Sequence, residues 1–570
     1  MHLNPGRLEP VGERLQERKR KTKPSDPKYF WGGESLSWEE ACKHFVTVGG
    51  TGSGKSITLN LLLESVLCKI GDKDGKKRRV LVYDPKADLV NMIAAMLPAG
   101  KTLRILNPLD ARFARWDIWE DVKTETDAIE FASLMIPRND KETSPYFSDT
   151  ARALLAGVVR RFIATSSETG EPWSLRDVLL AFRTTKTLKT VLDHHETDYL
   201  LDHFLPDNSK NFAGVKSSVD TALAIYRPLA ALLEPTQLQP NTLAPVISKE
   251  PFSIRRWLKE ESVIVLGNHE SAREATDTLN RLLFRQLAKL IVTREGVIEG
   301  DETWIFLDEA REAGKLDGLR QLLLRGRSKG VAVAIGFQDV EGMYEVYSDH
   351  EGAEIVGAAQ NVALLHINPS APKTADWASS VFGTRRDYVT TDSKSFKAES
   401  LGDQLGRQLK PETVERGGTE QLGMVPNLLP IQLTQMPMPA PGKPLHYYAY
   451  TNTEKHGYGF YTSEFLAQDG PKRAFGKIAR DFVLQSDPRR FKLLEWQPSD
   501  FVRLRIQPPA PPAPAAPPAP AQPLLVQVVN LSDIVPQTAR VPPASTPHPF
   551  KSAKPNLKDH GQGLPGASAV

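Results

Sequence analysis

The chain has 570 residues, which is too long for one compact core, so we expect two or more domains. Its net charge of +3 is small, so any surface that binds nucleic acid must be local. The two cysteines, Cys42 and Cys68, exclude a disulfide framework and a cysteine-based zinc site, and they suit a reducing cytoplasm. No apolar run approaches the length of a membrane-spanning helix, so the sequence predicts none.

Residues 1–40 form a predicted basic N-terminal arm. Residues 18–23 hold five lysines and arginines, which favour either a solvated arm or contact with DNA phosphate or an anionic membrane surface. Near the end of this arm, Ser37 is expected to cap a short helix that begins at Trp38.

The most informative motif follows a short apolar segment at residues 45–48 and precedes a predicted helix from residue 57. It fits the pattern G-x-x-x-x-G-K-[ST] of a phosphate-binding P-loop, and a chance glycine-rich turn is the weaker interpretation. The predicted cofactors are ATP and Mg²⁺. Lys55 would approach the β- and γ-phosphates and the Ser56 hydroxyl would bind Mg²⁺. The predicted nucleotide-binding residues are Gly49, Gly50, Thr51, Gly52, Ser53, Gly54, Lys55 and Ser56.

The next segments predict a parallel sheet interrupted by helices. Residues 79–86, 102–108 and 262–267 read as core strands, which the strand–helix order makes parallel. Between them, residues 125–255 are predicted to be an all-α insertion domain, since apolar residues recur there at helical spacing. His194, His195 and His203 fall in this insertion. Their spacing matches no metal signature, so we expect a solvated helix face.

A second motif completes the predicted catalytic site. Residues 304–309 are four apolar residues followed by Asp308 and Glu309, as in a buried strand that ends in two carboxylates. Beside a P-loop, Asp308 would hold Mg²⁺ and Glu309 would be the general base for the attacking water. A solvated Asp-Glu turn is the alternative for this segment taken alone.

The remaining segments complete the predicted organisation. Residues 331–338 and 361–366 read as further strands, so the P-loop domain is assigned to residues 41–124 and 256–450. Residues 425–445 are expected to be surface loops and residues 451–506 a C-terminal extension. Residues 507–570 form a predicted disordered Pro/Ala-rich tail, in which only residues 524–535 have enough apolar content to bind a partner. The predicted fold class is α/β, a RecA-like P-loop NTPase with a central, mostly parallel sheet.

Four features together resemble the type IV secretion coupling proteins, the TraD/TraG group of the FtsK–HerA class of P-loop ATPases. They are the P-loop with Asp84-Pro85-Lys86 after the next strand, the helical insertion, the stretch from Leu307 to Gln338–Asp339, and residues 374–383. The third feature is the most specific, because other P-loop ATPases share only the two Walker motifs. The resemblance covers residues 45–429.

This resemblance implies a homohexameric ring whose active sites lie between subunits. It places an arginine finger at Arg327 and a γ-phosphate sensor at Gln338, beside the catalytic residues Lys55, Asp308 and Glu309. A surface salt bridge and a strand-end cap are the alternatives for these two residues, since Arg311, Arg320 and Arg325 are near in sequence. The implied function is that of a DNA-stimulated ATP hydrolase. It would deliver a conjugative DNA–relaxase substrate to a type IV secretion channel.

The implied partners are DNA, single-stranded and bound without sequence preference, the relaxase or relaxosome, and the channel ATPases. Coupling proteins usually begin with transmembrane helices, whereas the residues before the P-loop strand are polar here. We therefore expect a cytoplasmic protein, with peripheral contact to the inner membrane through partners. Two other functions stay open. One is a HerA/FtsK-like translocase in repair or phage defence, and the other is a non-enzymatic adaptor switched by nucleotide.

Overall fold

The structure is a computed structural model. It describes residues 28–86, 89–110, 112–137, 145–204, 210–234, 247–268, 273–295, 300–395, 415–451, 456–463, 466 and 492–508. The basic run at residues 18–23 and the apolar segment at residues 524–535 lie outside these residues, as does the Pro/Ala-rich tail from residue 509 onward.

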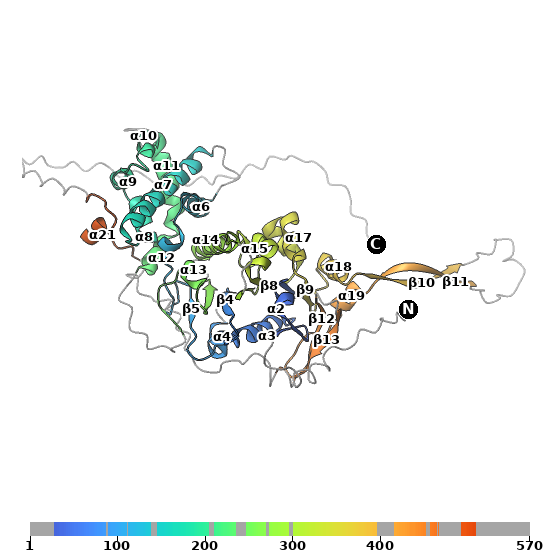
Figure 1. The fold of residues 1–570 in the computed structure, drawn as a ribbon. Coiled ribbons are helices and arrows are strands. Elements are labelled where there is room, and N and C mark those ends of the chain that lie inside the picture. The colour runs from blue at the N-terminus through green and yellow to red at the C-terminus, as the bar shows by residue number, and fades with distance from the viewer. Residues whose placement is uncertain are drawn as a thin grey trace, which may run out of the picture. The chain divides into compact units, whose positions relative to one another are not determined.

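Among the described residues, nine strands form one central sheet (Figure 1). Seven of them run parallel, and β12 and β13 extend the β9 edge in antiparallel pairing. The predicted mostly parallel α/β sheet is thereby confirmed. In spatial order the strands are β13 (His456–Tyr461), β12 (Leu445–Tyr450), β9 (Asn361–Leu364), β3 (Phe45–Val48), β8 (Val331–Phe337), β7 (Asp301–Leu307), β4 (Lys77–Asp84), β6 (Val263–Gly267) and β5 (Leu103–Ile105).

Successive side chains of a strand point to opposite faces of a sheet. Both sets are apolar here, and helices cover both faces of the sheet. On β4, Val80 and Val82 join one apolar core with helices α3 (Lys55–Leu67) and α4 (Val90–Met96). Leu81 and Tyr83 join the other core with α14 (Arg273–Val292), α15 (Leu319–Arg325), α16 (Val340–Tyr347) and α17 (Asp349–Gly357). The strands are therefore buried on both faces, which explains their continuous apolar runs.

The segment between β5 and β6 is helical, as predicted. Residues 210–233 form two helices, and Pro228 lies in the first turn of the second, where its missing N–H needs no partner. The prediction of a helix face was wrong for His194 and His195, which lie in the turn between α9 (Thr185–Leu192) and α10 (Tyr199–Phe204), whereas His203 lies in α10. The helices of this insertion are α5 (Ile118–Asp121), α6 (Glu125–Met135), α7 (Tyr146–Thr169), α8 (Leu175–Ala181), α9 (Thr185–Leu192), α10 (Tyr199–Phe204), α11 (Lys210–Ala224), α12 (Arg227–Leu233) and α13 (Ile254–Trp257).

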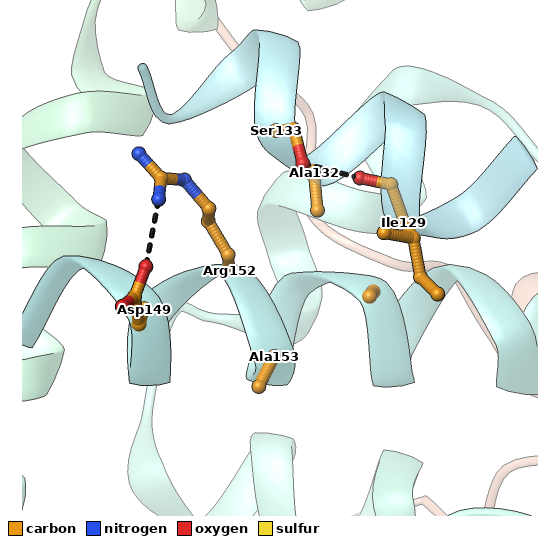
Figure 2. A pocket seen from close by; sticks show the side chains of 7 residues that line it. Ile129, Ala132, Ser133, Asp149, Arg152 and Ala153 are labelled. Atoms are coloured by element: carbon orange, nitrogen blue, oxygen red, sulfur yellow. Dashed lines mark hydrogen bonds and ion pairs between the residues drawn. The ribbon is translucent and has the colours of Figure 1, made fainter. Parts of the chain in front are cut away.

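A groove opens between α6 and α7 (Figure 2). It is lined by Ile129, by the small residues Ala132, Ser133, Ala153 and Ala156, and by an ion pair in which Arg152 Nη1 lies 2.8 Å from Asp149 Oδ1. All of these residues belong to the helical insertion, so this hollow is distinct from the P-loop region.

Several elements were not predicted. The longest is a hairpin of β10 (Thr384–Ser395) and β11 (Glu415–Pro426), which pair over their whole length after α18 (Pro372–Val381). The N-terminal side adds a small hairpin, β1 (Tyr29–Trp31) with β2 (Glu34–Leu36), and then α2 (Trp38–Ala41), which Ser37 caps as expected. The expected loop at residues 425–445 contains α19 (Pro430–Thr434).

Residues 492–508 pack against the helical insertion, although they fall in the predicted C-terminal extension together with β13 of the central sheet. Arg503 of α21 (Pro498–Arg503) lies 3.0 Å from the buried carboxylate of Asp177 in α8. The indole of Trp496 donates to the same carboxylate at 2.9 Å. The extension predicted as one unit therefore contributes to two parts of the fold.

No helix among the described residues is long and apolar enough to cross a bilayer.

Candidate nucleotide-binding site

The P-loop joins β3 to α3, the strand–loop–helix setting that the motif requires. Gly52 and Gly54 have φ angles of 75° and 100°, in the left-handed region that favours glycine. A Cβ atom on Gly54 would also lie 2.4 Å from Leu445 Cδ1 of β12, so the Leu445 side chain would have to move to admit one. The loop thus delivers the N-terminus of a 13-residue helix to the carboxyl edge of the sheet. An anion is stabilised at such a helix end.

Lys55 is buried at the base of this loop. Its Nζ atom donates to the carbonyl oxygens of Gly49 at 2.8 Å and Gly50 at 3.2 Å, and lies 3.9 Å from Glu309 Oε1. Burial lowers the pKa of Lys55, and the carboxylates of Glu309 and Asp308 oppose that change. The ammonium group is thus held at the loop, within reach of both carboxylates of the second motif.

Asp308 follows β7 at the same edge of the sheet. The Ser56 hydroxyl donates to Asp308 Oδ2 at 2.7 Å. Within the described part of the chain, the buried Oδ1 atom has no hydrogen-bond partner. Burial raises the pKa of this carboxyl group, and the bond from Ser56 opposes that rise. A hydroxyl next to a carboxylate with a free buried oxygen fits Mg²⁺, which prefers hard oxygen ligands.

Glu309 has an unusual backbone conformation, with φ at 61°. A non-glycine residue in this region is strained, and such strain clusters at functional sites. The next residue is fixed to β8, because Ala310 N donates to Gly336 O at 2.8 Å. The Glu309 carboxylate lies between two cations, with Oε1 3.9 Å from Lys55 Nζ and 4.0 Å from Lys86 Nζ.

Gln338 connects the two motifs. It follows β8 at the edge that carries the P-loop, and its Nε2 donates to Glu309 Oε2 at 3.3 Å. Its Oε1 accepts a hydrogen bond from the Thr51 hydroxyl at 3.2 Å. One amide therefore contacts both the phosphate-binding loop and the predicted base.

Arg327 lies at the opposite end of β8. It opens the short helix η2 (Arg327–Lys329), which directly precedes the strand, and its side chain is exposed. The seven residues of β8 span about 23 Å, at about 3.3 Å per residue. Arg327 is thus remote from the P-loop of its own chain. Two neighbouring arginines are engaged elsewhere, Arg311 with Glu345 and Arg320 with Glu354.

The sequence prediction assigned no role to Lys86, although its ammonium group joins the site. Residues that follow parallel strands collect at one edge of the sheet, and Lys86 follows β4, the neighbour of β7. That argument already placed Asp308 and Glu309 at this edge and could have placed Lys86 there. His366 also escaped the prediction. Its carbonyl accepts from Gly50 N at 2.7 Å and so helps to shape the P-loop.

The sheet order, the P-loop at its carboxyl edge and the paired carboxylates define a P-loop nucleotide-binding fold. The sequence model of one family, described as the type IV secretion-system coupling protein DNA-binding domain, matches residues 28–437. The chain belongs to this family.

Relatives and solved structures agree with this placement. The chain is 22% identical over 386 residues to the coupling protein TraD of Escherichia coli K12, covering 65% of this chain and 48% of TraD. It is 22% identical over 374 residues to the conjugal transfer protein TraG of Rhizobium radiobacter, covering 63% and 54%. The chain spans about half the length of these curated relatives.

The similar solved structures include the plasmid coupling protein TrwB in two complexes. In complex with ADP and Mg²⁺, it gives a TM-score of 0.55 at 19% identity and covers 80% of this chain and 93% of TrwB. In complex with the ATP analogue ADPNP, it gives 0.54 at 19% identity and covers 81% and 95%. At this identity, the match shows a shared fold.

Proposed function

We propose that the chain is a ring-forming ATP hydrolase that moves DNA for conjugative transfer. It would deliver a DNA–relaxase substrate to a type IV secretion channel. The observation that carries the proposal is the separation of Arg327 from the other site residues. Lys55, Asp308, Glu309 and Gln338 meet at one edge of the sheet, whereas Arg327 lies at the other. We infer that an arginine at that end serves the site of another subunit.

Each side chain has a role that its surroundings support. Ser56 and Asp308 would hold Mg²⁺, which when bound neutralises charge on the phosphates. Lys55 would contact the terminal phosphates. Glu309 would accept the proton of the attacking water, and Gln338 would sense the γ-phosphate, since its amide contacts both Thr51 and Glu309. Arg327 of a neighbouring subunit would stabilise the charge that develops on the phosphoryl oxygens.

Family membership supports the choice of partners. The relatives are named as coupling and conjugal transfer proteins, which supports DNA, a relaxase complex and channel ATPases as the partners of this chain. We propose that DNA, in single-stranded form, is bound through phosphate and stimulates hydrolysis. Binding would then weaken steeply with salt. We place the homohexamer at the cytoplasmic side of the inner membrane, held there by partners.

The test is an ATPase assay with and without single-stranded DNA, with the size of the assembly measured in parallel. The proposal expects Mg²⁺-dependent hydrolysis that rises with DNA and accompanies ring formation. A protein that binds ATP without hydrolysing it, with or without DNA, would instead be the nucleotide-switched adaptor. Hydrolysis by a stable monomer would contradict the shared site. Lys55→Ala is the control for contaminating ATPases.

A further inference from the structure

A buried histidine ties the loop that carries Arg327 to the strand that leads into the P-loop. His44 directly precedes β3 and is only 2% exposed. Its Nε2 lies 2.8 Å from the carbonyl oxygen of Leu323 in α15, and its Nδ1 lies 3.2 Å from the backbone N of Val333 in β8. Because Leu323 and Val333 bracket Arg327 in the chain, one imidazole joins both flanks of the finger segment.

The chemistry of these two bonds fixes the state of the ring. A backbone N–H can only donate, so Nδ1 is the acceptor and the proton is on Nε2, which donates to Leu323 O. The imidazole is therefore neutral. Burial agrees with this assignment, because it lowers the pKa of His44 to about 4. The hydrogen bond that Nε2 donates to Leu323 O and the charge of Arg327 are smaller influences on that pKa.

Both partners of the imidazole are backbone groups that lack an ordinary partner in secondary structure. Leu323 lies in the last turn of α15, where carbonyl oxygens have no intrahelical donor. Val333 lies one position before Ala334, the residue opposite Phe45 where the ladder between β8 and β3 begins. His44 thus caps the helix and extends the ladder at once. No aliphatic side chain could do either.

The turn that carries His44 is itself firmly held. His44 has a φ of 64°, and its carbonyl accepts from Asn361 N at 3.2 Å and from Asn361 Nδ2 at 3.1 Å. On the finger side, the Arg327 side chain approaches Cys42. Burial raises the pKa of the Cys42 thiol, and the charge of Arg327 opposes that rise. The finger segment therefore rests on the residues that lead into β3.

We propose that His44 is a positioning residue for Arg327. Through His44, the position of the arginine that serves a neighbouring subunit depends on β3, the strand that leads into this subunit's own P-loop. The inference rests on the proposed shared site. His44 would act on a nucleotide that its own chain does not bind, so its loss should leave the binding of nucleotide to its own P-loop intact.

The test compares His44→Ala and His44→Asn with the wild type in the full-length assembly. We expect His44→Ala to lower kcat about 10- to 100-fold, since a misplacement of about 1 Å is enough for such a loss. KM and the affinity for the non-hydrolysable analogue ADPNP should stay within about twofold. Asparagine tolerates a positive φ and keeps an amide at the position of Nδ1, so His44→Asn should recover part of kcat.

Mixed rings separate an effect on the neighbour from an effect within the subunit. Lys55→Ala subunits carry an intact His44 and Arg327, so adding them to His44→Ala subunits should restore activity at interfaces where their finger meets an intact P-loop. The double variant His44→Ala/Lys55→Ala, added to His44→Ala subunits in the same way, should restore no activity, because no subunit in the ring then has an intact His44. Asn361→Ala is the matched control, because it loosens the same turn and leaves both imidazole bonds; its kcat should stay within about twofold of the wild type.

Several results would overturn the assignment of His44. They are an unchanged kcat, a loss that intact Lys55→Ala subunits do not relieve in rings shown to be mixed, or an equal loss in Asn361→Ala. A fall in ADPNP affinity as large as the fall in kcat would place the effect in the subunit's own site. These results differ from failure of the proposed function, in which the wild type itself would not hydrolyse ATP or Arg327→Ala would be fully active.

Discussion

Gln338 Nε2 donates to Glu309 Oε2 at 3.3 Å, so the predicted phosphate sensor holds the predicted general base. The same amide accepts from the hydroxyl of Thr51 in the P-loop. A change in the loop when nucleotide binds would therefore reach the base through one side chain. This relationship makes the base and the sensor separable by mutation.

Glu309→Gln should retain ATP but hydrolyse it about 100-fold more slowly or worse, because an amide cannot accept the proton of the attacking water. The measurement is steady-state hydrolysis beside ATP binding at equilibrium. Lys55→Ala is the companion variant and should lose both activities. Normal turnover by Glu309→Gln would remove Glu309 from the role of base.

Gln338→Ala should lower kcat about tenfold, with a smaller change in the affinity for ADP, since ADP lacks the phosphate that the amide would sense. Thr51→Val is the companion variant, because it removes the hydroxyl that donates to Gln338 and keeps the bond from Gln338 to Glu309. If the two variants lost equal activity, the bond from Gln338 to Glu309 would make no contribution of its own to kcat. Affinities for ADP and ADPNP should be measured with the rates.

Arg327→Ala subunits should be inactive alone and should regain activity when mixed with Lys55→Ala subunits. Mixed rings contain interfaces in which an intact P-loop meets an intact arginine, and a finger is worth about 10³-fold or more in kcat. The assay follows hydrolysis across mixing ratios. Arg320→Ala is the control, since Arg320 already pairs with Glu354 and should be dispensable. No recovery in rings shown to be mixed would count against a site shared between subunits.

Arg503→Ala should destabilise the helical insertion by about 2–3 kcal/mol, because Asp177 is fully buried and would lose its charged partner. Glu168→Ala breaks the exposed pair with Arg505 and should cost less than about 1 kcal/mol. Denaturant unfolding together with hydrogen exchange in α8 measures both. Equal effects would mean that residues 492–508 do not hold this helix in solution.

The buried imidazole of His44 predicts a dependence of stability on pH. Its pKa is lowered from 6.5 to about 4 in the folded chain, so the unfolded chain binds a proton at pH values where the folded chain does not. The stability it contributes is present above pH 6.5 and is lost as the pH falls toward 4. His44→Asn should lose less stability over this interval than the wild type. Parallel curves for the two proteins would contradict a buried neutral imidazole.

Much of this site could be predicted from the sequence, because its motifs are continuous and their strands end at one edge of the sheet. Asp308, Glu309 and Gln338 each follow a predicted strand, and the structure brings them together. Their chemical roles stay predictions. The link from His44 to Leu323 could not be predicted, since nothing local marks two residues so far apart in the chain.

The missed strands have physical reasons as well. β10 and β11 read TRRDYVTTDSKS and ERGGTEQLGMVP, which lack the alternation of apolar and polar residues that marks a half-buried strand. Each of the two strands pairs with the other over its whole length, a partner that neither stretch of sequence indicates by itself. β12 and β13 are rich in aromatic residues, and β13 also holds two glycines. Their place in the sheet depends on the edge that β9 offers.

The packing of Leu445 beside Gly54 has a consequence for the synthesis of the protein. The phosphate-binding loop is synthesised before β12, and this strand emerges from the ribosome only after the helical insertion and most of the sheet. A nascent chain that ends before Leu445 would hold the whole P-loop motif without the side chain that packs beside Gly54. Competence to bind nucleotide should therefore arise late in synthesis, which would keep incomplete chains from capturing ATP.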